Sequence, residues 1–124
     1  MKKSNAKEDK DLQKENNLQN QGIYTLTAEA ENDLKEIWVY IAENNRSAAD
    51  KLIEGIFGKF QLLADNKEIG KRQDNFIIEM RMFPFKKYHI YYFPGGEGVE
   101  IYRVLHGSRD IEGEFEDYFE GLSE

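Results

Sequence analysis

Apolar residues follow a helical period soon after the polar N-terminus, behind a short β-prone run. Ile23 to Leu26 forms that run, and Thr27 then supplies an N-cap with two glutamates in the next turn. The positions that follow repeat at intervals of three and four residues and make one apolar stripe: Leu34, Ile37, Trp38 and Ile41. We therefore predict a strand that passes directly into a helix, which ends at Asn44 and Asn45.

A second helical stripe begins after a short connection. Ser47, with Asp50 three residues later, is close to a capping box, and the stripe runs to about Asp65. The short connection predicts that the two helices are antiparallel. Gly55 and Gly58 inside the second helix each cost about 1 kcal/mol relative to alanine, which suggests close helix packing at these positions.

The period changes to two in the second half of the chain. Residues 76–83 alternate as a strand would, until Pro84 interrupts the pattern. Residues 88–93 form a further strand with bulky side chains on both faces. The glycine-rich turn at 94–98 then returns the chain as a strand over 99–105, so the last two strands are predicted to form a hairpin.

The two ends of the chain differ from its centre. Residues 1–21 contain too few apolar side chains to offset the entropy of ordering, which predicts a polar flexible tail before a folded domain over 22–124. Apolar positions from 111 onward, among acids, predict a short acidic helix. The predicted fold class is α+β: a strand, an antiparallel two-helix hairpin, a three-stranded antiparallel meander and a short C-terminal helix.

Composition narrows the function. A chain of 124 residues with 40% hydrophobic residues supports one modest core, and the absence of cysteine excludes disulfides and thiolate zinc sites. The sequence has neither a leader-like N-terminus nor a membrane-length apolar run, so we expect a cytoplasmic protein that does not contact the membrane. The histidines and carboxylates have no metal-ligand spacing, and the glycine-rich turn does not open a helix, so no metal and no cofactor are expected.

One segment is specific enough to suggest a family. Residues 101–110 read Ile-Tyr-Arg-Val-Leu-His-Gly-Ser-Arg-Asp, and weaker matches occur at 24–27 with Ala30, at 33–34, at 37–40, and at Gly70 with Arg72. Over about residues 23–111 the chain resembles the ParE/RelE toxin superfamily of bacterial type II toxin-antitoxin systems, in particular its ParE branch. It departs from the usual pattern at Gln73, where members often have proline, in its longer N-terminal tail and in its acidic C-terminal helix.

The resemblance implies a stable toxin that is neutralised by a cognate antitoxin, whose flexible segment wraps the toxin until proteolysis removes it. ParE-type members poison DNA gyrase by protein contact, whereas RelE-type members cut mRNA in the ribosome. Residues 22–124 hold 12 basic and 20 acidic residues, a net charge of −8, which favours the gyrase-directed alternative because an RNA-cutting cleft needs a basic surface. A degenerate, non-toxic member that only holds its antitoxin at an operator is a third alternative.

We expect no catalytic residue if the chain is a gyrase inhibitor, and Arg81, Arg103 and His106 as the catalytic set if it is a nuclease. The residues expected to bind the target are Arg81, Arg103, His106 and Arg109. Each has a structural alternative: Arg81 in a salt bridge with Glu79, His106 bonded to backbone at a strand end, and Arg103, Arg109 and Asp110 in an exposed ion-paired corner.

Two further features have no assigned role. His89 lies in the middle of a predicted strand among tyrosines, so we interpret it as a packing residue. A basic concentration flanks the second predicted strand and is either a solvated face or a surface for an acidic antitoxin segment or for DNA held by gyrase: Lys67, Lys71, Arg72, Lys86 and Lys87.

Overall fold

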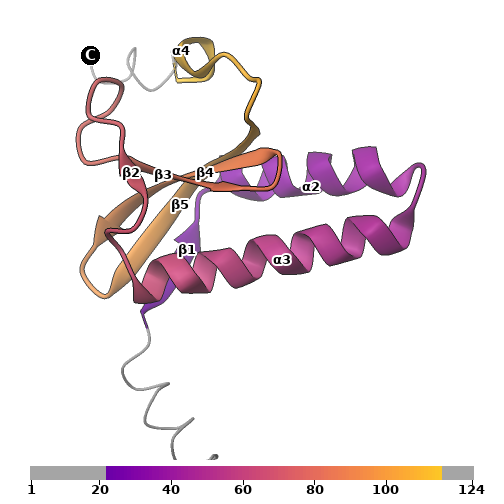
Figure 1. Cartoon of the computed structure of the whole chain (residues 1–124), viewed down its shortest axis with the longest axis horizontal. Coiled ribbons are helices and arrows are strands. Elements are labelled where there is room, and N and C mark those ends of the chain that lie inside the picture. Colours follow the sequence, from indigo (N-terminus) through magenta and orange to yellow (C-terminus); the bar gives the residue numbers. More distant parts are fainter. Residues whose placement is uncertain (1–21, 116–124) are drawn as a thin grey trace, which may run out of the picture.

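Two antiparallel helices lie across one face of a five-stranded sheet (Figure 1). This computed structural model describes residues 22–115, so the predicted tail and everything after residue 115 lie outside the described part. The described elements are β1 (Ile23–Leu26), α2 (Ala28–Ala42), α3 (Arg46–Asp65), β2 (Lys71–Arg72), β3 (Arg81–Phe85), β4 (Tyr88–Gly95), β5 (Gly98–His106) and α4 (Ile111–Glu114).

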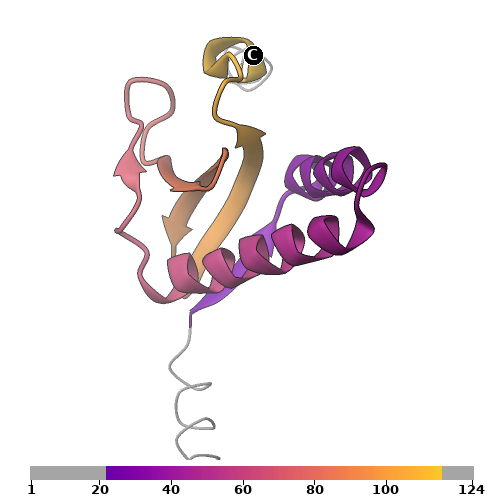
Figure 2. The same ribbon diagram turned by 45° about the vertical axis from the view of Figure 1, so that its right-hand side comes forward.

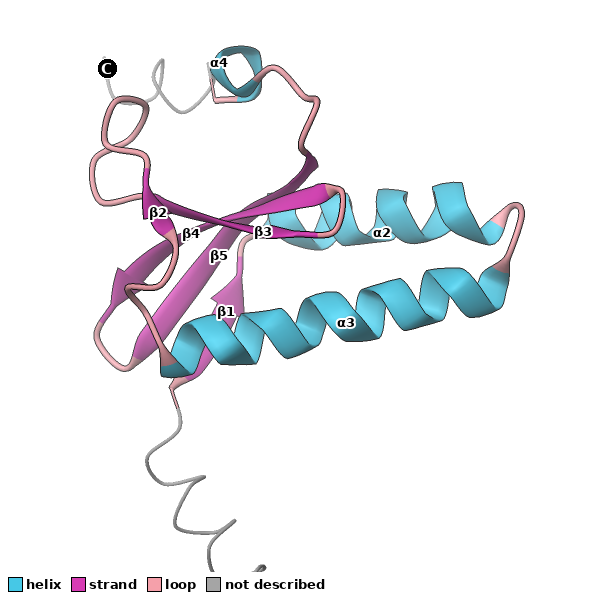
Figure 3. Cartoon of the chain, viewed as in Figure 1, coloured by secondary structure: helices cyan, strands magenta, loops and turns pink. Residues whose placement is uncertain are grey.

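The sheet confirms the predicted fold class and adds to it. Its strand order is β1-β5-β4-β3-β2, and β3, β4 and β5 form the predicted antiparallel meander (Figure 3). The N-terminal strand pairs in parallel with β5, with Ile23 opposite Gly98, and the two-residue β2 pairs with the start of β3. The first strand thus runs beside β5, which brings the start of α2 close to the middle of β5.

The first helix begins as predicted. The Thr27 hydroxyl accepts a hydrogen bond from the amide of Ala30 at 3.0 Å, which satisfies one of the free N–H groups of the first turn. The same hydroxyl donates to the carbonyl of Tyr102 at 2.7 Å. One N-cap side chain therefore both starts α2 and fixes it to β5.

The second helix differs from its prediction in two details. Its N-cap is Asn45, whose side-chain oxygen accepts from the Ala48 amide at 3.0 Å, so Ser47 lies inside the helix. The glycines do not mark contact between the helices: a Cβ at Gly55 would meet the ring of Phe85 at 2.9 Å, whereas one at Gly58 would meet nothing within 4 Å. Gly55 therefore lets β3 approach α3.

The predicted strand over 76–83 is wrong for most of its length, because residues 73–80 form turns and β3 begins only at Arg81. The carboxylate of Asp74 accepts the Glu79 amide at 2.8 Å, and Glu79 has a φ of 68°. A side chain that bonds nearby backbone in this way competes with strand pairing. Pro84 does not end the strand: it lies within β3, beyond the two residues that β2 pairs.

Apolar side chains fill both faces of the sheet. The larger cluster lies between the helices and the sheet and is centred on Ile56, Phe60 and Ile101, none of which is exposed. The smaller cluster lies on the other face, where Phe115 is fully buried against Tyr91. Figure 2 shows α4 (yellow) above the sheet, on the side away from α3. Within residues 22–115, the helices are too short or too polar to cross a bilayer.

Candidate functional site

A groove opens where the helical hairpin extends past the end of the sheet. It has a volume of about 730 Å³ and runs between the second half of α2, the β3–β4 turn and the end of β5. We call it the hairpin groove and define it by its apolar lining: Ile37, Tyr40, Ile41, Leu52 and Tyr88. The apolar stripe of α2 continues beyond the sheet, so its last turns have no strand to cover them.

Aromatic side chains give the hairpin groove its most exposed apolar surface. Tyr40 is 75% exposed, although it lies beside the apolar stripe of α2. Tyr88 lines the same groove, and its pKa is raised mainly by burial and secondly by the neighbouring Tyr40. A large, mostly apolar side chain with a polar tip is typical of protein interfaces.

The rim of the hairpin groove is mainly basic. Lys86 and Lys87 come from the β3–β4 turn, His106 ends β5 and Arg109 follows it, while the exposed Glu36 of α2 also lines the groove. The Gly107 amide donates to the Lys87 carbonyl at 2.8 Å, which holds the two segments together. The sequence singled out these residues as separate candidates, and the pairing of the strands brings them together at one end of the sheet.

His106 is exposed and its ring is fixed by the turn that follows it. The Ser108 amide donates to its Nδ1 at 3.1 Å, and the Ser108 hydroxyl lies 2.7 Å from the same atom. This geometry matches the structural alternative, a histidine bonded to backbone at a strand end.

Arg103 is not the exposed corner residue that we expected. Its Nε and Nη2 atoms bind the two carboxylate oxygens of Asp33 at 2.8 and 2.9 Å, and the two side chains are only 16% and 6% exposed. The Val104 amide donates to the same carboxylate at 2.9 Å. Hydrogen bonding to Asp33 is the main cause that raises the pKa of Arg103. The pair joins α2 to β5 and faces the interior.

Arg109 is half-exposed and takes part in the corner of ion pairs. Its side chain is 52% exposed and forms an ion pair with Glu114 of α4, which also lies 3.4 Å from Arg103. The predicted corner of ion pairs therefore exists, but the acid at its centre is Glu114. Asp110, the acid that we expected there, stands at the N-terminal boundary of α4.

Arg81 lies elsewhere and binds backbone. Its Nη1 atom donates to the carbonyls of Glu68 and Gly70 at 2.9 and 2.7 Å, which fixes the connection between α3 and β2. Glu79 and Arg81 both line a small polar cavity of about 190 Å³. Within residues 66–85, which are all described, the salt bridge joins Arg72 to Asp74 at 2.7 Å. The predicted salt bridge between Glu79 and Arg81 is therefore wrong.

The three residues of the alternative nuclease set do not converge. Arg81 pairs with Tyr92 in the middle of β4, and His106 pairs with Tyr88 at its start. Four residues along a strand span about 13 Å. Arg103 pairs with Tyr91, next to the position of Arg81 in register, but its guanidinium is bound to Asp33.

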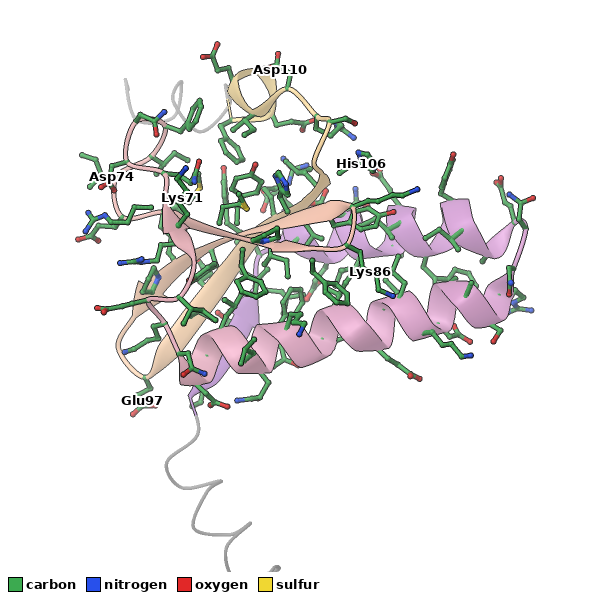
Figure 4. The ribbon with its side chains drawn as sticks, viewed as in Figure 1. Lys71, Asp74, Lys86, Glu97, His106 and Asp110 are labelled. Atoms are coloured by element: carbon green, nitrogen blue, oxygen red, sulfur yellow. The ribbon has the colours of Figure 1, made fainter. Side chains whose placement is uncertain are left out.

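The basic residues also divide into two groups. Lys71 and Lys86 stand at opposite sides of the sheet, and Lys86 lies on the side of His106 (Figure 4). Lys67 binds the Gly96 carbonyl at 2.8 Å, which adds it to neither group. His89 packs against the ring of Tyr91, with centroids 6.3 Å apart, as the packing interpretation predicted.

Sequence reasoning missed Asp33 and Glu114, the two acids that organise this end of the fold. Asp33 had a signal: it stands three residues after Ala30 and four before Ile37, on the apolar side of α2. A carboxylate at such a position requires a buried partner. Glu114 had no comparable signal, because it is one acid among several near the C-terminus.

Comparisons with known proteins give the family. A solved chain described as part of the chromosomal ParDE toxin-antitoxin system from P. aeruginosa superposes with a TM-score of 0.59 and 17% sequence identity, over 70% of this chain and 97% of the other. At that identity the likeness concerns the fold. A search of curated proteins finds no match. The family model described as "ParE toxin of type II toxin-antitoxin system, parDE" matches residues 24–111, and the chain therefore belongs to the ParE toxin family.

Proposed function

We propose that this ParE-type toxin inhibits DNA gyrase by protein contact in the cytoplasm and is neutralised by a cognate antitoxin that covers the same surface. The observation that carries the proposal is the hairpin groove, an apolar depression with a basic rim at the uncovered end of the helical hairpin. His106 and Arg109, two of the four residues expected to bind a target, lie on it.

The groove has the features of a protein-binding site. Apolar and aromatic side chains line a depression that could bury part of a partner, and Lys86, Lys87 and Arg109 outnumber the one exposed acid on its rim, Glu36. In an acidic protein, such a rim selects partners with acidic segments and accelerates their encounter. A flexible antitoxin segment with apolar anchors and carboxylates would satisfy both requirements, and its binding would exclude the target.

The geometry gives less support to RNA cleavage. Cutting through a 2′-hydroxyl needs a base, an acid and a cation within reach of one phosphate. Here Arg81 binds two carbonyls and Arg103 binds Asp33. His106 stands opposite the first residue of β4, four positions along that strand from the residue that pairs with Arg81. A partner would have to move two of these side chains before they could act together.

Expression of the full chain without antitoxin tests the proposal. We expect growth arrest with gyrase-dependent DNA breaks, and we expect Arg109→Ala to weaken the arrest while the protein remains folded. Lys51→Ala, which removes an exposed cation from α3 away from the groove, is the matched control and should stay fully toxic. Codon-positioned mRNA cuts would instead establish the nuclease alternative, and normal growth would establish a non-toxic member.

A further inference from the structure

Lys86 and Lys87 line the hairpin groove, and Lys59 of α3 contacts the same aromatic ring as Lys86. The Nζ atoms of Lys59 on α3 and Lys86 in the β3–β4 turn each lie 5.5 Å from the centre of the Phe85 ring. Lys87 follows Lys86 in the same exposed turn. Within residues 22–115, the ion pairs involve none of these three lysines. We call them the lysine cluster.

The backbone at Lys86 is also unusual. Its φ is 55°, in the left-handed region that asparagine or glycine normally occupies in a tight hairpin turn. A lysine there costs free energy that an asparagine would largely avoid. Conformations of this kind concentrate at binding sites, so an observed outlier supports a hypothesis of function. The turn thus places a cation where the fold alone would favour a different residue.

Like charges that are gathered and unpaired repel one another, and an anion relieves that repulsion. The domain is acidic, so the cluster opposes its average charge. Because charges separated by more than about 8 Å are screened at physiological salt, the local cluster decides what binds there. The ammonium group of lysine binds phosphate as a point charge. Recognition of a carboxylate through two parallel hydrogen bonds instead favours the guanidinium group of arginine.

We propose that the lysine cluster, with Arg109 beside it, binds the phosphate backbone of double-stranded DNA. The cations come from three elements: Lys59 from α3, Lys86 and Lys87 from the β3–β4 turn, and Arg109 from the segment after β5. This inference rests on the proposed function, because gyrase holds DNA: the toxin would contact its target enzyme through the groove and the bound duplex through the lysines.

Binding of a fluorescently labelled DNA duplex to the full chain at low salt, followed by anisotropy, tests this inference without gyrase. The test variant is Lys86→Glu with Lys87→Glu, and the matched control is Lys71→Glu with Arg72→Glu, which makes the same charge change in the other basic group. We expect at least a tenfold loss for the first and less than about a twofold loss for the second. Each phosphate contact contributes about −0.9 to the slope of log affinity against log salt, so we expect a slope between about −2 and −4.

Three results would overturn the inference: equal losses in both double variants, no binding of the duplex at low salt, or preference for polyglutamate over the duplex. The last would assign the lysines to an acidic protein segment. Because the assay contains no gyrase, its failure leaves the proposed function intact. A chain that binds DNA through these lysines but does not inhibit gyrase would refute the proposed function alone.

Discussion

Arg103 and Asp33 form a two-bond ion pair that connects the last strand to the first helix, with N–O distances of 2.8 and 2.9 Å. Both side chains are largely buried. Removing one member of a buried pair leaves an uncompensated charge, so we predict that Arg103→Ala and Asp33→Ala each cost about 3–5 kcal/mol of unfolding free energy. Urea titration of each variant measures this.

The exposed neighbour provides the comparison. Arg109→Ala should cost less than about 1 kcal/mol, because exposed ion pairs contribute little to stability. Loss of toxicity in Arg103→Ala would therefore report unfolding, and of these two variants Arg109→Ala is the one that tests target contact. If Arg103→Ala were as stable as the wild type, the structural role assigned to this pair would be wrong.

The start of α3 gives a second prediction. Asn45→Ala removes the side-chain oxygen that accepts the Ala48 amide, and should lower the free energy of unfolding by about 1 kcal/mol. Ser47→Ala changes a residue inside the helix and should leave stability unchanged or slightly higher. Thermal melts followed by circular dichroism distinguish the two sites. A larger loss at Ser47 would restore the capping box suggested by the sequence.

Phe115 gives a third prediction, on the face of the sheet away from the hairpin. It is fully buried, and its ring contacts those of Tyr91 and Tyr102 at 5.2 and 5.6 Å. Phe115→Ala should therefore cost about 3–5 kcal/mol. Ile78→Ala, at a side chain that is 77% exposed, is the apolar control and should change stability little. Equal effects of the two substitutions in chemical denaturation would contradict the placement of α4.

Alkaline pH gives a fourth prediction. Burial raises the pKa of both Tyr91 and Tyr92. The fold therefore favours the neutral phenols, and their contribution is fully present below the pKa of an unfolded tyrosine, about 10. It is lost as pH rises through the folded-state values. We expect stability to fall above about pH 10, together with late ionisation in an ultraviolet absorbance titration. Tyrosines that all ionise normally while the chain stays folded would refute this.

The sequence predicted the parts of the fold that depend on local periodicity. The stripe from Leu34 to Ile41 identified α2, the separate stripe that runs to about Asp65 identified α3, and the glycine-rich turn before β5 identified the final hairpin, because each pattern lies within one local segment. The strand predicted for the segment before β3 was wrong, because alternating apolar residues also fit a turn in which Ile77 and Met80 enter the same cluster. The hydrogen bond from the Glu79 amide to Asp74 favours the turn over the strand, and the apolar periodicity gives no information about that bond.

The site was predictable as a set of residues and not as an arrangement. His106 and Arg109 were identified through the closing segment, and both lie on the hairpin groove. The apolar lining comes from α2, α3 and β4, and the partners Asp33 and Arg103 are 70 residues apart. Contacts over such separations depend on strand order and helix placement, which single residues do not specify.

Supercoiling by purified DNA gyrase, measured with increasing full-length toxin, tests the central claim most directly. We predict inhibition by the wild-type chain, and weaker inhibition by Tyr40→Ala, which removes the most exposed aromatic side chain of the hairpin groove without disturbing the core. Undiminished supercoiling at excess toxin, together with mRNA cleavage on ribosomes that depends on Arg81 or His106, would contradict the account.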